Sequence, residues 1–175
     1  EAKRILHSRQ VMVDGRIETD DGRGVGLMDV LSVGEKNFRC VLDINGKLRY
    51  RPIPKNAVGS KICRVTGKTT IRGAKTQLHL HDGRNLLMDD ASAYKSGDSV
   101  IISLPEQQIT SHLPFTEGAQ SYLTGGSHIG EIATVRGHDV KRSSKANEVQ
   151  FDDFLTIADY VFIIGSESDI PGAES

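Results

Sequence analysis

The stretch that decides the fold reads FRCVLDINGKLRYR and covers residues 38–51. Its first five residues are apolar apart from one arginine, and the Asn45-Gly46 pair that follows favours a tight turn. In the last five residues cations alternate with apolar side chains, which is the period of a strand with one wet, basic face. Two prolines directly beyond it end the strand. The stretch therefore predicts a β-hairpin with cations on its outer face.

Similar short strands are expected on both sides of this hairpin, from about residue 27 to residue 113. Helical periodicity is scarce here, and turn-forming residues recur between the apolar runs. The expected strands cover 61–65, 69–71, 76–81, 85–88 and 100–104. This spacing predicts a compact, barrel-like β domain and a mainly β chain, with α+β character only at the N-terminus.

The beginning of the chain changes from helix-forming to β-prone residues. Residues 1–9 predict a short helix and 11–17 a tight hairpin. We expect Ile5 and Leu6 to pack inward. Glu1 follows no initiator Met or leader, so we expect the first module to be cut short.

A third unit of strands is expected from about residue 115 onward. An apolar strand at Tyr122-Leu123 leads into a Gly-rich turn, and Gly130 then opens an alternating apolar run. This pattern is typical of a KOW motif, whose tight glycine turn lets the backbone approach a nucleic acid closely. A Gly-Gly turn in any small barrel would look the same.

The end of the chain is expected to complete this unit and then to fray. Further strands are expected at 149–151 and 160–164, after a hydrophilic interruption at 137–147. The small, acidic residues 166–175 predict a flexible tail.

The net charge of −1 conceals two oppositely charged halves. Residues 1–84 contain 17 Lys and Arg against 9 Asp and Glu, a balance of +8, whereas 85–175 contain 5 against 14, a balance of −9. The first half can face a polyanion and the second mostly cannot. The 175 residues are too few for a large enzyme barrel, and no apolar run approaches the roughly 18 residues that span a bilayer.

The sequence contains no recognisable catalytic motif. It has no nucleophile elbow, zinc-protease helix or phosphate loop, and the glycines of 22–26 indicate a flexible connection. Cys40 and Cys63 predict buried thiols of a reducing compartment rather than a disulfide or a zinc site. His79 and His81 have a spacing that suits a metal, but polar residues on the wet side of a strand look the same. We expect no cofactor, metal or small-molecule substrate.

Seven anchors in order along the chain resemble one family, the archaeal and eukaryotic type of small-subunit ribosomal protein four. The anchors are EAKRIL (1–6), VDGR (13–16), GLMDV (26–30), DGRN (82–85), YKSGD (94–98), TGG (124–126) with Gly130, and YVFIIG (160–165). The resemblance implies a partial RNA-binding helix and hairpin module at 1–33, a central family-specific β domain at 34–114, and an SH3-like barrel with a KOW motif at 115–165. It also implies a non-enzymatic ribosomal protein of the cytoplasm, whose partners are small-subunit rRNA and neighbouring ribosomal proteins, without a membrane.

Candidate RNA-binding residues come from the resemblance and from the charge pattern. The resemblance assigns RNA contacts to Lys3, Arg4, His7, Arg9 and Arg16 in the first module, and to Gly125, Gly126, Ser127, His128 and Gly130 in the KOW turn. Folded rRNA is bound mainly through its shape and phosphates, so cations on rigid strands are also expected to contact it. They are Arg49, Arg51, Arg64, Lys68, Arg72, Lys75 and Arg84, with a further basic island of Lys141, Arg142 and Lys145.

Two other functions are open at this point. A KOW-containing transcription or RNA-processing factor would place the KOW unit after an α/β domain, which the β-rich middle of this chain does not resemble. A fragment of an RNA-modifying enzyme, such as a pseudouridine synthase, would need a larger catalytic domain than the short strands leave room for.

Overall fold

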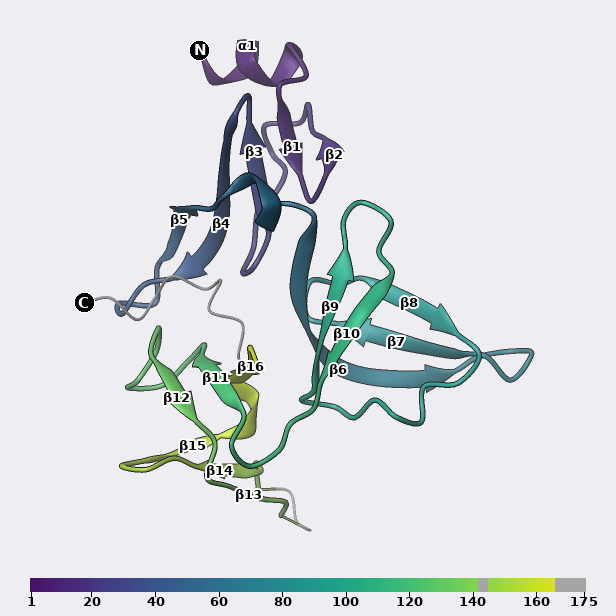
Figure 1. Ribbon diagram of the computed structural model, residues 1–175, viewed down its shortest axis with the longest axis vertical. Coiled ribbons are helices and arrows are strands. Elements are labelled where there is room, and N and C mark those ends of the chain that lie inside the picture. The colour runs from purple at the N-terminus through teal and green to yellow at the C-terminus, as the bar shows by residue number, and fades with distance from the viewer. Residues whose placement is uncertain (142–144, 166–175) are drawn as a thin grey trace.

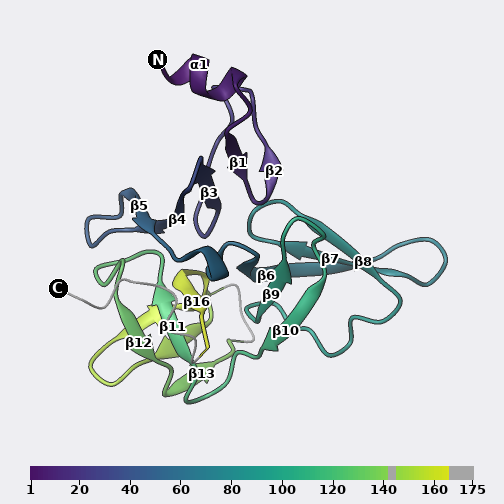
Figure 2. The same cartoon turned by 45° about the horizontal axis from the view of Figure 1, so that its top comes forward.

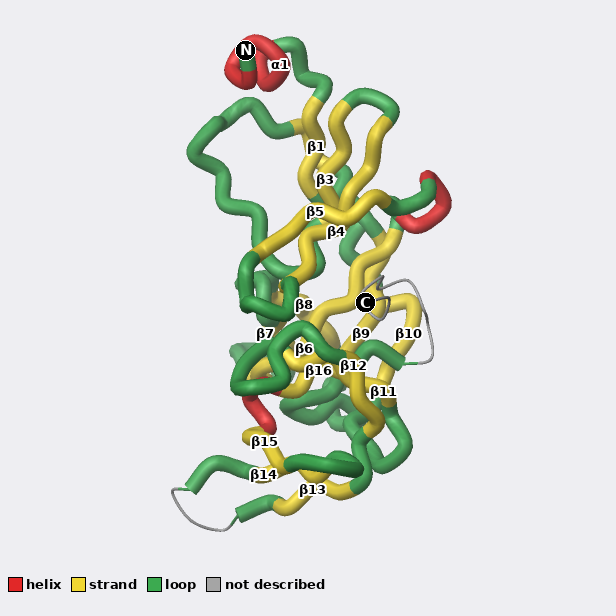
Figure 3. Tube along the Cα trace, turned by 90° about the vertical axis from the view of Figure 1, so that its left-hand side faces the viewer, coloured by secondary structure: helices red, strands yellow, loops and turns green. Residues whose placement is uncertain are grey.

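The structure, a computed structural model, describes residues 1–141 and 145–165. Short strands dominate these residues and form four sheets, so the predicted mainly β fold is confirmed (Figure 1). In Figure 3 the first sheet, which begins at residue 11, lies near one end of the long axis. The last three-stranded sheet, formed by strands within residues 137–157, lies at the other end. Within the described part of the chain, no helix has the length and apolar character needed to cross a membrane.

The first sheet contains the hairpin predicted over 38–51. Its strands are β1 (Val11–Val13), β2 (Arg16–Ile17), β3 (Val30–Val33), β4 (Lys36–Leu42) and β5 (Leu48–Pro52), in the order β2-β1-β3-β4-β5. β4 and β5 pair in register around the Asn45-Gly46 turn, which confirms the hairpin. The boundary predicted between the first and second modules, at residues 33 and 34, falls in the turn that joins the paired strands β3 and β4. The strands of this one sheet therefore belong to both predicted modules.

The expectation of a single wet face on β5 is wrong. Leu48 and Tyr50 are 47% and 50% exposed, and Arg49 on the opposite face is exposed as well. β5 is the edge strand of its sheet, and Leu48, Arg49 and Tyr50 show that neither of its faces is covered along this stretch. Alternation in the sequence gave the period of the strand correctly but not its surroundings.

The N-terminal helix α1 (Ala2–His7) and the β1–β2 hairpin form where they were expected. The inward packing expected for Ile5 and Leu6 is wrong, because Ile5 is exposed and no residue of the helix is buried. The helix stands beyond the end of the first sheet, away from the cores of the molecule (Figure 1). Leu6 is partly buried, and the other residues of the helix are exposed.

The second sheet follows a short 3-10 turn, η1 (Lys55–Ala57). Its strands are β6 (Ser60–Thr70), β7 (Thr76–Leu80), β8 (Asn85–Met88), β9 (Ser99–Ser103) and β10 (Ile109–Leu113), in the order β10-β9-β6-β7-β8. The first half of β6 pairs with β9 and the second half with β7. We call residues 66–88, which contain the second half of β6 together with β7 and β8, the wing, because they project sideways from the rest of the molecule (Figures 1 and 2).

The C-terminal unit consists of two three-stranded sheets. One has the order β12-β11-β16 and the other the order β13-β14-β15. The strands are β11 (Gln120–Leu123), β12 (Ile132–Thr134), β13 (Gly137–Asp139), β14 (Glu148–Gln150), β15 (Leu155–Ile157) and β16 (Val161–Ile163), with η2 (Ala158–Tyr160) before the last. Strands were expected at the positions of β11, β14 and β16. β13 lies inside the stretch expected to be an interruption, because its backbone pairs with β14 and this pairing needs no apolar side chain.

Three apolar cores hold the sheets together. One belongs to the second sheet and receives Val30 from the first, and one belongs to the C-terminal unit. The middle core is shared, since Met28 and Val41 of the first sheet region meet Ile62 and Ile101 of the second sheet and Phe162 of β16. The three parts of the chain are therefore packed on one another.

Candidate nucleic-acid interface

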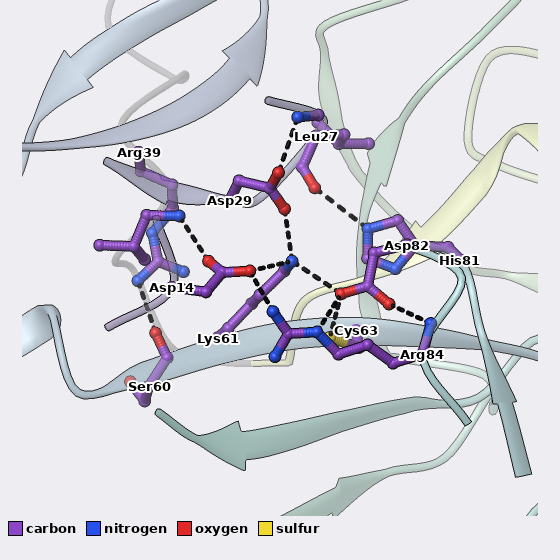
Figure 4. A network of polar contacts seen from close by, with 12 residues as sticks. Asp14, Leu27, Asp29, Arg39, Ser60, Lys61, Cys63, His81, Asp82 and Arg84 are labelled. Carbon is purple, nitrogen blue, oxygen red and sulfur yellow. Dashed lines mark hydrogen bonds and ion pairs between the residues drawn. The ribbon is translucent and has the colours of Figure 1, made fainter. Parts of the chain in front are cut away.

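A buried ion-pair network lies where the first and second sheets meet. Lys61 of β6 has a fully buried side chain, and its Nζ lies 3.0 Å from Asp14 Oδ2 and 2.8 Å from Asp82 Oδ2 and also contacts Asp29 Oδ1 (Figure 4). The three carboxylates come from the β1–β2 turn, the residue before β3 and the β7–β8 turn. Arg84 pairs with two of them, Asp14 and Asp82. The network thus ties two sheets together through side chains from four separate segments.

Each carboxylate of the network also accepts a backbone N–H. Asp14 Oδ1 accepts from Val30, Asp29 Oδ2 accepts from Gly26, and Asp82 Oδ1 accepts from Arg84. Both oxygens of every carboxylate are therefore used, as the burial of charged groups requires. The local turns are held in place by the same groups that neutralise Lys61.

The electrostatics of the network keep Lys61 charged. Burial alone lowers the pKa of the Lys61 ammonium, but Asp14, Asp29 and Asp82 together raise it above its ordinary value. Burial likewise raises the pKa of Asp82, and its bonds to Lys61 and Arg84 outweigh this effect, so the pKa of Asp82 ends below its ordinary value. At neutral pH both partners are ionised.

The same three carboxylates have the oxygen donors of a cation site, since their oxygens lie within 4.8 Å of one another. The Lys61 ammonium, however, contacts all three and supplies the positive charge itself. We therefore assign the cluster as a structural ion-pair network. A cleft of about 770 Å³, bordered by residues 23–27 and 81–84, opens above it.

His81 and Arg64 extend this junction to the C-terminal unit. His81 lies between Leu27 O, 3.1 Å from Nε2, and the Arg64 N–H, which donates to Nδ1, and its ring meets Phe162 edge-on. Burial lowers the pKa of His81, so the ring stays neutral at physiological pH. Arg64 donates from its guanidinium to the carbonyls of residues 158 and 159. These contacts explain His81 without the metal site that its spacing from His79 suggested, because the ring joins three parts of the fold.

Several of the cations expected to contact RNA are bound inside the chain. Arg64 and Arg84 are 17% and 18% exposed, and Lys68 donates to the carbonyls of Ala91 and Tyr94. Three more form ion pairs near the surface: Lys3 with Asp21, Arg49 with Asp43, and Lys141 with Asp139 and Glu148. The sequence pattern gave no sign of these partners: those of Arg64 and Lys68 come from distant segments, and alternation in a strand does not reveal even the nearby pairing of Arg49 with Asp43.

A second set of expected cations faces outward. Among the described residues, Arg4, His7, Arg9, Arg16, Arg72 and Lys75 are exposed, Arg51 is partly exposed, and no ion pair is found for any of them. They lie in two regions, the helix and hairpin at the N-terminus and the outer turn of the wing, with Arg51 on β5. Lys145 borders a small hollow with Asn147 and Asp159, and Arg142 lies outside the described residues.

The glycines of the expected KOW turn are used for close packing within the chain. A Cβ on Gly125 would lie 2.4 Å from the Tyr160 ring, and a Cβ on Gly130, whose φ is +83°, would lie 2.7 Å from Asp43 O. Gly126 also borders the Tyr160 ring. Internal contacts therefore require glycine at 125 and 130.

The two polar residues of the same turn lie at the surface. Ser127 is exposed, whereas the His128 ring stacks on Phe154 at a centroid distance of 3.8 Å. Of the expected contact residues in this turn, Gly126 and Ser127 are exposed and His128 is partly exposed.

Of the ion-pair network, only Arg84 was singled out from the sequence, as a candidate RNA contact, although the three aspartates also carried a signal. Asp14, Asp29 and Asp82 each stand in one of the seven anchors, where two of them were interpreted as turn formers. Lys61 carried no such signal, because an alternating strand does not reveal that both of its faces are covered. Its burial depends on carboxylates that are 32 and 47 positions away in one direction and 21 in the other.

Comparison with known proteins identifies relatives along nearly the whole chain. The model of a family described as ribosomal family S4e matches residues 34–109. Small ribosomal subunit protein eS4 of Methanothermobacter thermautotrophicus is 40% identical over 97% of this chain and 72% of its own length, and that of Picrophilus torridus is 40% identical over 95% and 71%. The crystal structure of the 30S ribosomal protein S4e from Thermoplasma acidophilum superimposes with a TM-score of 0.85 and 34% identity, covering 95% of this chain and 86% of that one. From this identity, coverage and shared fold, we conclude that the chain belongs to the S4e family of ribosomal proteins.

Proposed function

We propose that this chain is a non-enzymatic, structural component of the small ribosomal subunit in the cytoplasm, and that it binds and stabilises rRNA. The observation that carries the proposal is the set of cations that remain exposed without an ion pair in the described residues, at the N-terminal module and the outer turn of the wing. Relatives with 40% identity are named as proteins of this subunit. Cations on stiff elements suit an RNA partner, because folded RNA is bound largely through phosphates and shape.

The proposal includes a division of labour among three parts. The helix and hairpin of residues 1–33 supply Arg4, Arg9 and Arg16 for phosphate contacts, the central β region of 34–114 supplies the wing, and 115–165 form an SH3-like barrel that carries the KOW turn. The acidic surface of the C-terminal unit faces solvent or basic neighbouring ribosomal proteins rather than RNA.

A salt-dependent binding experiment tests the RNA part of the proposal. The purified chain is titrated against small-subunit rRNA at several salt concentrations, with an Arg9→Ala/Arg16→Ala variant beside it. Phosphate contacts predict steep weakening with salt, and the variant should lower the slope of log affinity against log salt by about one for each lost contact. The matched control is Lys3→Ala/Arg49→Ala, because both of these cations already have carboxylate partners. A salt-independent affinity, or equal effects of the two variants, would contradict the proposal.

A further inference from the structure

The two faces of the wing differ sharply. Its inner face carries Leu78 and Leu80, which are buried in the core of the second sheet, with Leu86 and Met88 packed beside them. The outer face is the opposite side of the same strands, and the register gives its members: Gly67, Thr69, Gln77, His79, Asn85 and Leu87. None of these six residues is acidic. Leu87 is 57% exposed. The outer face is therefore a mostly polar surface that contains one aromatic ring, that of His79, and no negative charge that would repel a polyanion.

The His79 ring is fixed on this face from both sides. Its Nδ1 lies 2.6 Å from Asn85 Oδ1 on β8, and its Nε2 lies 2.9 Å from Thr69 Oγ1 on β6. An amide oxygen only accepts, so in the neutral ring the proton is on Nδ1 and the Thr69 hydroxyl donates to Nε2. Both ring nitrogens are satisfied within the chain. What the ring still offers to a partner is its flat surface.

The residue opposite the ring contributes nothing that covers it, and His79 is partly exposed. Gly67 is the cross-strand partner of His79 and has no side chain to lie over the ring. A Cβ at Gly67 would meet only His79 Cδ2, at 4.0 Å, so nothing in the packing requires glycine there. The missing side chain at Gly67 thus leaves room beside a partly exposed ring, where a flat group could approach from outside.

The outer turn of the wing adds free positive charge. Residues 60–88 contain six Lys and Arg and a single Asp. Four of the cations are bound internally, as described above, which leaves Arg72 and Lys75 exposed in the turn. The turn is closed by a hydrogen bond from the Ile71 N–H to Lys75 O at 2.8 Å, and Gly73 and Ala74 have positive φ angles. Its conformation is thus defined, and it holds both cations away from the body of the molecule.

We propose that the outer face of the wing docks on an unpaired segment of small-subunit rRNA, with the His79 ring stacking on a base and Arg72 and Lys75 contacting phosphates. Lys75 and His79 are four positions apart, or roughly 13 Å along an extended strand, which brings both kinds of contact onto one short stretch of RNA. Unpaired bases stack on aromatic rings, and the cationic turn supplies the charge complementarity that an RNA partner requires. The inference rests on the proposed function, because it names the site through which the central region would bind rRNA.

The decisive experiment separates stacking from hydrogen bonding at His79. The full chain and its variants are titrated against small-subunit rRNA at one salt concentration. His79→Gln keeps polar atoms but removes the ring, and we expect it to weaken binding by about tenfold, within the range for loss of one base stack. His79→Phe keeps a ring without nitrogens and should stay within about twofold of wild type, since stacking on an aromatic face does not need them. A ring that serves only to join Thr69 and Asn85 would give the opposite order, with Phe the weaker binder, and this order would overturn the inference.

Two further variants make the test independent of the stability of the His79 variants. Gly67→Leu places a side chain beside the ring without a backbone clash, and should weaken rRNA binding while leaving thermal unfolding nearly unchanged. Arg72→Ala/Lys75→Ala should lower the salt slope by about two, whereas Lys55→Ala/Lys95→Ala, an equal change of exposed charge elsewhere, should lower it less.

If wild type bound rRNA and these variants bound equally well, this inference would fail and the proposed function would stand. If wild type did not bind, both would fail. Unchanged rRNA affinity with weaker incorporation into the subunit would assign the face to a protein neighbour, which also overturns the inference.

Discussion

Lys61 illustrates how far the role of a single side chain follows from the sequence. The alternating pattern at 61–65 correctly indicated a strand, and lysine would ordinarily be placed on its wet side. The fold instead buries Lys61 completely, because Asp14, Asp29 and Asp82 converge on it from three different turns. No local pattern contains that information. The outward-facing Arg16, Arg72 and Lys75, in contrast, lie in or beside tight turns, where exposure follows from local structure and was predictable.

Replacing Lys61 with methionine should destabilise the protein strongly. Lys61→Met keeps the length and apolar stem of the side chain but leaves Asp14 and Asp82 with Arg84 as their remaining ion-pair partner, and Asp29 without its ion pair to Lys61. Removal of one member of a buried ion pair typically costs about 3–5 kcal/mol, because the remaining charge stays buried without compensation. We expect a loss of this size in the free energy of unfolding, measured by urea denaturation at pH 7.

The matched control for this substitution is Lys55→Met, which makes the same chemical change at an exposed position of η1. Its free energy of unfolding should stay within about 0.5 kcal/mol of wild type, as is usual for surface substitutions. If Lys61→Met were as mild as Lys55→Met, the carboxylates would have to be compensated by something other than the Lys61 ammonium.

The acid stability of the protein should depend on Asp82. The folded-state pKa of Asp82 lies below its ordinary value of 3.8, so its ionisation contributes stability above about that pH, and the contribution is lost as the pH falls through the folded-state value. The raised pKa of Lys61 has the opposite sign, and its contribution is lost only when the pH rises far above neutrality. We therefore expect Asp82→Asn to be less stable than wild type at pH 7 but to lose less stability between pH 5 and the acid limit. Urea denaturation across this range measures both, with the exposed Asp153→Asn as control; parallel pH profiles for wild type and Asp82→Asn would contradict the assignment.

Individual strands and turns were largely predictable, because their signals are local. The hairpins at 11–17 and 38–51 each combine β-prone runs with an Asp-Gly or Asn-Gly pair, and both form as expected. β13 and β15 were not predicted, since their pairing with β14 is made by backbone groups and their side chains are mostly polar or isolated. The turn at 124–130 was predicted from its glycines. Position 130 needs glycine because it lies close to the β4–β5 turn. That turn is more than eighty positions away in the sequence, so this requirement was not predictable.

Gly130 should tolerate substitution poorly because of this contact. In Gly130→Ala the new Cβ would lie 2.7 Å from Asp43 O and 2.8 Å from Asp43 C, at a φ of +83° that alanine rarely adopts. Backbone strain and overpacking together predict a loss of about 2–4 kcal/mol in the free energy of unfolding. Gly118→Ala is the matched control, because Gly118 has the same φ of +83° with open space around it. It should cost only the backbone strain, about 1 kcal/mol. Thermal and urea denaturation compare the two, and equal losses would show that the contact with Asp43 contributes nothing.

The division of the whole molecule into three parts follows the sequence only approximately. Anchors and strand spacing predict a boundary at residue 115, which stands shortly after β10 in the chain. They do not reveal that the first sheet continues to β5, or that Met28, Ile62 and Phe162 share one core. Shared cores depend on how sheets dock, and docking is decided by contacts between distant segments. A binding surface assembled from such parts, as proposed for the N-terminal module and the wing, keeps its geometry only if the parts stay packed together.

Tyr122 tests whether the parts unfold as one. Its buried hydroxyl, on β11, donates to Leu42 O and accepts from the Leu42 N–H of β4 at 2.9 Å, which joins the C-terminal unit to the first sheet. Tyr122→Phe leaves both backbone groups of Leu42 without this partner, so we expect a loss of about 1–3 kcal/mol in the free energy of unfolding. Tyr50→Phe, at a half-exposed ring of β5, should cost much less. Because the middle core is shared, circular dichroism and tyrosine fluorescence should report one coincident urea transition that shifts as a whole in Tyr122→Phe. Two separate transitions, of which the substitution shifts only one, would mean that the C-terminal unit folds independently. The middle core would then not fix the position of this unit relative to the cationic regions.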